Sequence, residues 1–127
     1  METLYSKYKN ELEIVLKSIV KTCELELYYV DCSMSLLSDY LNIDELDAVM
    51  TERSISAITV AAVWIIDKYI MDDHIYLDFI CSSLSVNRRD VITIETDIFN
   101  KCSRISKYVP DDLTPPESNK EEFWKEI

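Results

Sequence analysis

Residues 57–66 form an unbroken run of apolar or small side chains inside the longer segment SISAITVAAVWIIDKYIM, residues 54–71. A helix at a protein surface shows one apolar stripe, whereas a helix that is apolar all round is buried on all sides. A run of this length is too short to cross a hydrocarbon core, which needs about 20 residues. The run therefore predicts a buried central helix, about 52–70, with Trp64 in the core and the other helices packed around it.

Glycine is absent from the whole chain of 127 residues. Dinucleotide fingerprints, phosphate-cradling loops and nucleophile elbows use glycine where the backbone approaches a ligand closely or adopts a positive φ. Those motifs are therefore excluded. Tight β-hairpins also favour glycine, so its absence favours helices, and the sequence predicts an all-α protein.

The composition is that of a single globular domain with an acidic surface. Hydrophobic residues make up 48% of the chain and charged residues 29%, which is enough apolar surface for one core. The formal net charge of -11 repels phosphate backbones and anionic membranes, so we expect neither nucleic acid nor a membrane as a partner. The opening segment METLYSKYKN is charged and lacks the apolar run of a signal peptide, so we expect an intracellular protein, nuclear, cytoplasmic or both.

The cysteines and the single histidine show no pattern typical of a metal site. Cys23, Cys32, Cys81 and Cys102 lie far apart without a CxxC pair, and His74 is the only histidine. A tetrahedral zinc site thus has no recognisable ligand set. We expect reduced thiols in the core and no metal, cofactor or small-molecule ligand.

Four further helices are predicted from apolar residues that recur at intervals of three and four. Thr22 is expected to cap the second of them, because threonine accepts hydrogen bonds from the first N–H groups of a helix. The expected ranges are 3–21, 24–41, 75–83 and 88–103.

The last of these segments is rich in β-branched residues, which also suits a strand. The spacing of Val91, Ile94 and Ile98 favours a helix, and Asn87 begins a capping-type sequence just before it. From Val109 the three prolines of the chain mark a linker. We therefore divide the chain into a helical domain, residues 1–108, and an acidic proline-containing tail, residues 109–127, with a possible short helix over 119–126.

The residues of the central helix resemble a cyclin box. Ala61 and Ala62 match the small pair that this family places in its third helix, and Lys68 and Tyr69 match the lysine and aromatic that follow. Glu95 matches the glutamate of the family's fifth helix. The resemblance implies a five-helix cyclin-box fold around the buried central helix.

Two further segments extend the resemblance over residues 10–105, which is one whole box. LSDYL at residues 37–41 is similar to the end of the family's second helix, and NRRDV at 87–91 to the opening of its fifth. Asn10 and Leu16 stand where the first helix often has an arginine and a tryptophan, so the resemblance does not extend to a substrate-peptide site there. A single trimmed box suits a divergent or virus-encoded cyclin.

The resemblance implies a kinase-binding site made by Lys68 and Glu95, flanked by Tyr69 and Phe99 as aromatic anchors. Both charges would reach the activating helix of a cyclin-dependent-type kinase and its adjoining loop. From the residues alone, Lys68 and Glu95 are equally two surface charges, with an ion pair worth about 0–1 kcal/mol. Tyr69 and Phe99 are equally core aromatics.

The implied function is that of a regulatory subunit that binds and activates or redirects a cyclin-dependent protein kinase and has no chemistry of its own. The alternative is a kinase-independent adaptor that uses the same face for another protein. A DNA-binding member of this fold is disfavoured by the charge of -11. An enzyme would need a site built without glycine, metal ligands or a visible acid–base pair.

Overall fold

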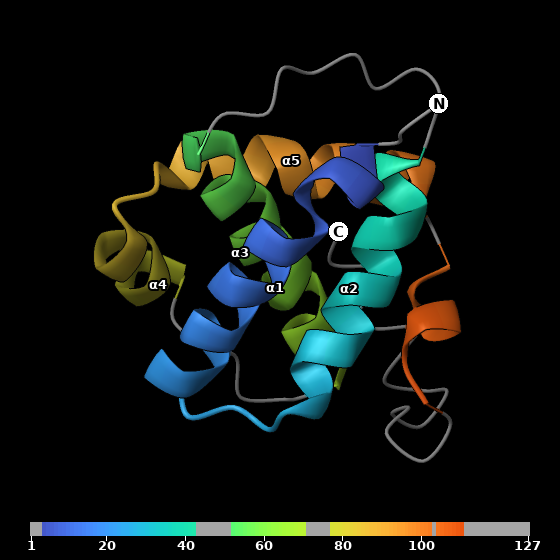
Figure 1. Ribbon diagram of the computed structural model, residues 1–127, viewed down its shortest axis with the longest axis horizontal. Helices are drawn as coiled ribbons and strands as arrows, with labels where there is room; N and C mark the ends of the chain where they lie inside the picture. The colour runs from blue at the N-terminus through green and yellow to red at the C-terminus, as the bar shows by residue number, and fades with distance from the viewer. Residues whose placement is uncertain (1–3, 43–51, 71–76, 103, 111–127) are drawn as a thin grey trace.

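The computed structural model describes residues 4–42, 52–70, 77–102 and 104–110. Within these residues the chain forms five α-helices and a single-turn 3-10 helix, without a β-strand (Figure 1), so the all-α prediction is confirmed. No described helix is both long enough and apolar enough to span a bilayer. The elements in chain order are α1 (Leu4–Thr22), α2 (Tyr28–Leu41), α3 (Glu52–Ile70), α4 (Leu77–Leu84), α5 (Arg88–Lys101) and η1 (Ile105–Tyr108).

α3 lies at the centre of the cluster, where it packs against α1, α2 and α5 (Figure 1). Between Val60 and Ile66 every side chain except that of Trp64 is completely buried. Ala61 and Ala62 leave room for neighbouring helices to approach the α3 backbone closely. The prediction of a buried central helix over 52–70 is therefore confirmed, and burial of this apolar run is the main favourable term in the fold.

The corner between α1 and α2 differs from the prediction. Thr22 is the last residue of α1, so it does not cap α2. α2 begins at Tyr28 rather than at residue 24, with Leu27 at its N-cap and no side-chain capping bond. The residues between the two helices serve to end α1: the amide of Leu25 donates to the carbonyl of Val20 at 2.9 Å.

Two helix ends place a residue other than glycine in the left-handed region. Glu24 after α1 and Ser85 after α4 both have φ of 55°. The amides of Glu24 and Ser85 donate to carbonyls three residues back, and the amides of the following residues to carbonyls five residues back. These bonds define a Schellman motif, in which glycine usually takes the left-handed position. Because the chain has no glycine, Glu24 and Ser85 adopt this conformation in spite of their Cβ atoms.

The N-terminus of α5 agrees with the prediction. The side chain of Asn87 accepts a hydrogen bond from the backbone N–H of Arg89 at 2.8 Å, as an N-cap residue does. α5 ends at Lys101, with Cys102 as its C-cap, slightly before the expected end at 103. α4 covers most of the predicted segment 75–83, of which residues 75 and 76 lie outside the described part.

The four cysteines are free thiols, three of them buried, as predicted. The end of the described chain also packs on the core, since Ile105, Tyr108 and Val109 are buried. The predicted short helix over 119–126 falls outside the described residues, as does His74.

Candidate functional site

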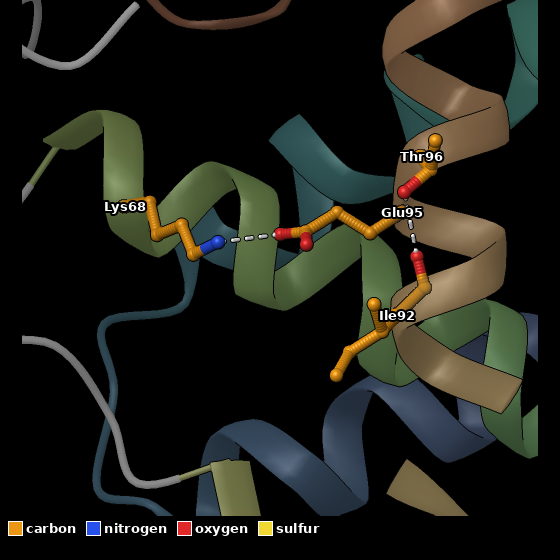
Figure 2. A network of polar contacts seen from close by, with 4 residues as sticks. All are labelled: Lys68, Ile92, Glu95 and Thr96. Carbon is orange, nitrogen blue, oxygen red and sulfur yellow. Dashed lines mark hydrogen bonds and ion pairs between the residues drawn. The ribbon is translucent and has the colours of Figure 1, made fainter. Parts of the chain in front are cut away.

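Lys68 in the last turn of α3 and Glu95 in the middle of α5 meet in an ion pair, with 2.7 Å between Nζ and Oε2 (Figure 2). The structure thus brings together two residues that are 27 positions apart in the chain. Their side chains are only 21% and 12% exposed, against 62% and 42% for the Lys17–Glu13 pair on α1. The Lys68–Glu95 pair is therefore screened less by solvent and ions than an ordinary surface pair.

Trp64 is a second neighbour of the Lys68 ammonium group. The Nζ atom lies 4.7 Å from the centre of the Trp64 ring, which stands one turn earlier on α3. A cation over the face of an indole is attracted by the ring quadrupole. Trp64 was predicted to lie in the core, but it is only partly buried: it packs against the core and also borders the ion pair. The ammonium group is held by a carboxylate and an aromatic face together.

The two aromatic residues predicted beside the pair lie at different depths. Tyr69 is 3% exposed and belongs to the core cluster. Phe99 is partly exposed and packs on the edge of that cluster, one turn after Glu95 on α5. The burial of Tyr69 agrees with the alternative that it is a core aromatic, while Phe99 keeps some surface that a partner can touch.

Asp67 is a polar residue of this region that the sequence analysis did not single out. Asp67 is 1% exposed, and its carboxylate accepts a hydrogen bond from the Tyr29 hydroxyl on α2 at 2.9 Å. Burial, followed by the negative charge of Asp67, raises the pKa of Tyr29 and also that of the Cys23 thiol. The spacing contained a signal: Asp67 follows Val60 and Val63 at intervals of seven and four, which places it on their core-facing side of the helix.

The segment LSDYL, which contributes to the cyclin resemblance, holds the C-terminal part of the fold in place. The hydroxyl of Tyr40 donates to Asp97 of α5. Asp39 accepts hydrogen bonds from the Tyr108 hydroxyl at 2.9 Å and from Lys107 at 3.1 Å. These two donors lower the pKa of Asp39 below its usual value. Asp39 and Tyr40 therefore tie α2 to η1 and to α5.

The outer side of α5 carries hydroxyl groups that bond to their own helix. Thr96 donates to the carbonyl of Ile92 at 3.0 Å (Figure 2). Thr93 donates in the same way to Arg89 at 2.9 Å. Ile92, which directly precedes Thr93, is 42% exposed and lies one turn before Glu95. Next to the ion pair, α5 thus presents one exposed apolar side chain, Ile92, beside two uncharged threonines.

Among the residues that the structure describes, no three histidine, cysteine or acidic side chains are grouped so that they could hold a metal ion. Comparisons of the chain with protein-family models, with curated proteins and with solved structures find no match. The site is therefore interpreted from its own geometry, together with the resemblance in its residues.

Proposed function

We propose that this protein is a cyclin-like regulatory subunit, with a single divergent cyclin box, that binds and activates or redirects a cyclin-dependent-type protein kinase. One observation carries the proposal: Lys68 and Glu95, the two residues that the resemblance implies for kinase binding, meet at 2.7 Å between α3 and α5. They lie on an all-helical scaffold with a buried central helix, as the resemblance implies. A regulatory subunit of this kind would act inside the cell, in the nucleus, the cytoplasm or both.

The ion pair can add contacts to a partner without being broken. A lysine ammonium has three N–H donors and a carboxylate has two oxygens, so each group keeps bonding capacity beyond their mutual bond. Ile92 and Phe99 flank Glu95 at intervals of three and four residues, and both have exposed surface. A polar pair beside partly exposed apolar side chains is suited to recognising the end of a helix in another protein.

The mechanism is a shift of population in the kinase. The bound subunit contacts the active arrangement of the activating helix better than the inactive one, and this difference in affinity favours the active state. The subunit contributes no reacting group, since its role is to bind the active arrangement.

The test is binding to and activation of purified cyclin-dependent-type kinases by the variants Lys68→Ala and Glu95→Ala. Both variants should keep the helical circular-dichroism spectrum and lose at least about tenfold in affinity, equal to about 1.4 kcal/mol. Lys17→Ala removes an ion pair from the exposed side of α1 and is the matched control. Wild-type binding and activation by both Lys68→Ala and Glu95→Ala would overturn the proposal.

A kinase-independent adaptor that uses the same face for another protein is the second candidate. The spare bonding capacity of the Lys68–Glu95 pair and the exposed surface of Ile92 serve such a partner equally well. Pull-down from cell extract followed by a kinase assay separates the two functions. If the wild-type protein pulls down kinase activity and Lys68→Ala does not, the protein is a regulatory subunit. If the wild-type protein pulls down a protein without kinase activity, and Lys68→Ala does not, the protein is an adaptor.

A further inference from the structure

Adjacent residues in the last turn of α3 bond to different neighbouring helices. Asp67 accepts a hydrogen bond from Tyr29 of α2, and Lys68 pairs with Glu95 of α5. Consecutive side chains leave a helix about 100° apart, so the two contacts restrain the last turn of α3 on two different sides. A rotation of α3 about its axis that lengthened one contact would also disturb the other.

Directional contacts matter here because the rest of the central helix is apolar. Burial of apolar side chains is non-directional and does not by itself define the angle of a helix about its axis. Ala61 and Ala62, both completely buried, have little side chain to interlock with the neighbouring helices. Hydrogen bonds weaken steeply when their angle is wrong. Polar contacts at the end of α3 are therefore suited to setting its rotation.

Tyr29 is held firmly enough to act as an anchor. It is 2% exposed and lies in the first turn of α2. Its ring stacks on that of Tyr28, with 5.1 Å between ring centres and 18° between planes. The Asp67 carboxylate is buried at the other end of the bond, and removing a donor from a buried carboxylate is costly.

We propose that the hydrogen bond from Tyr29 to Asp67 is a positioning contact, which fixes the last turn of α3 so that Lys68 meets Glu95. Tyr29 and Asp67 themselves touch no partner, because both are buried. The importance of this positioning for kinase binding rests on the proposed function. The positioning itself is a property of the isolated chain.

The test measures how well Lys68 is protected by its ion pair, using the full chain without any partner. The native protein is treated briefly with an acetylating reagent, and mass spectrometry compares modification of Lys68 with that of Lys101. Lys101 is a suitable internal reference because it pairs with Asp97 and its side chain is 28% exposed, close to the value for Lys68. Paired, partly buried amines react slowly, so loss of the Lys68–Glu95 contact raises the ratio of Lys68 acetylation to Lys101 acetylation.

Tyr29→Phe removes the hydroxyl and keeps the ring, and it should raise the Lys68 to Lys101 ratio several-fold. Tyr108→Phe is the matched control, because it also removes a hydroxyl that donates to a carboxylate, but between η1 and α2. It should leave the ratio unchanged. If Tyr29 had a merely structural role, Tyr29→Phe would lower stability and raise the acetylation rates of Lys68 and Lys101 alike. The ratio of the two rates would then be unchanged, which would overturn the proposal.

The double variant Tyr29→Phe/Asp67→Leu keeps the test decisive if Tyr29→Phe does not fold. Replacing both partners of a buried polar contact by apolar groups of similar shape is often nearly neutral for stability. The double variant should fold and still show the several-fold higher ratio, because the directional contact is gone. A wild-type ratio would overturn the proposal. Neither result depends on whether a kinase is the partner, so the outcome is separate from that of the proposed function.

Discussion

Glu24 and Ser85 hold the same backbone position at the ends of two different helices. Each has φ of 55° and closes the same pair of backward hydrogen bonds, one after α1 and the other after α4. For a residue with a Cβ atom, the left-handed region is less favourable than the right-handed one by about 1–2 kcal/mol. A chain without glycine therefore carries local strain at two of its corners.

Replacing Glu24 by glycine should raise the free energy of unfolding. Relief of the left-handed strain favours the variant by about 1 kcal/mol, and the greater freedom of glycine in the unfolded chain offsets part of this gain. We expect a net stabilisation of about 0.5 kcal/mol, seen as a higher urea midpoint with an unchanged slope. Ser85→Gly should behave alike.

Thr22→Gly is the control for this prediction, because Thr22 is a helical residue at the end of the same helix. Glycine there should lower stability by up to about 1 kcal/mol. A loss of stability in Glu24→Gly as well would mean that the left-handed conformation is not strained.

The Lys68–Glu95 pair should contribute more to folding than an exposed pair. A double-mutant cycle with Lys68→Met and Glu95→Gln should give a coupling energy of about 1 kcal/mol, because the pair is partly buried. The same cycle on Lys17 and Glu13 should give about 0.3–0.5 kcal/mol, as is usual for a helical pair four residues apart. Equal coupling in the two cycles would show that the burial of Lys68 and Glu95 adds nothing.

Ala61→Leu should destabilise the fold. The position is completely buried in α3, and extra methylene groups in a tightly packed core displace neighbouring side chains and backbone. We expect a loss of about 1–3 kcal/mol in chemical denaturation. Ser35→Leu, at an exposed position of α2, is the size-matched control and should change stability by less than about 0.5 kcal/mol. A similar effect of the two variants would indicate that the space around α3 is loosely packed.

Stability should fall at alkaline pH. Burial raises the pKa of all four thiols above their usual 9.0 and the pKa of Tyr29, Tyr40 and Tyr108 above the usual 10.0. Above these usual values the unfolded chain releases protons that the folded chain retains, so the stability present at lower pH is lost as pH rises.

Urea midpoints measured under reducing conditions should therefore be level from pH 7 to about 8.5 and decline from about pH 9 upward. Tyr40→Phe removes one of the titrating groups and should reduce the decline above pH 10, although it lowers stability at pH 7 by removing the bond to Asp97. A midpoint that is the same at pH 7 and pH 10 would contradict the prediction.

The parts of the fold that follow from apolar spacing could be predicted from the sequence. The range of α3 agrees with the prediction because ten apolar or small residues in succession permit few other arrangements. The start of α5 agrees because Asn87 forms a local bond that its own side chain provides. The start of α2 could not be predicted by the same means. The left-handed residue that ends a helix is usually a glycine, which is visible in a sequence, but here that residue is Glu24.

The candidate site could be predicted only in part, for a similar reason. Lys68 and Glu95 were predicted through a resemblance in residue pattern, and the structure places them in contact. Asp67 was not singled out from the sequence, because a carboxylate is rarely buried. One of the groups that satisfy it in the core is the hydroxyl of Tyr29, which lies 38 positions away. Spacing within α3 indicates that Asp67 faces the core, but it does not reveal which residue of another helix bonds to it, because that depends on how the helices pack.

Two threonines of α5, Thr93 and Thr96, use their hydroxyl hydrogens within their own helix. Thr93 and Thr96 each direct their hydroxyl hydrogen to a carbonyl of their own helix, so each hydroxyl oxygen meets solvent or a partner only as an acceptor. A protein that covers Ile92, Thr93 and Thr96 would meet no ionised group on these three side chains. Affinity gained there should accordingly depend weakly on salt, in contrast to affinity gained at the neighbouring charges.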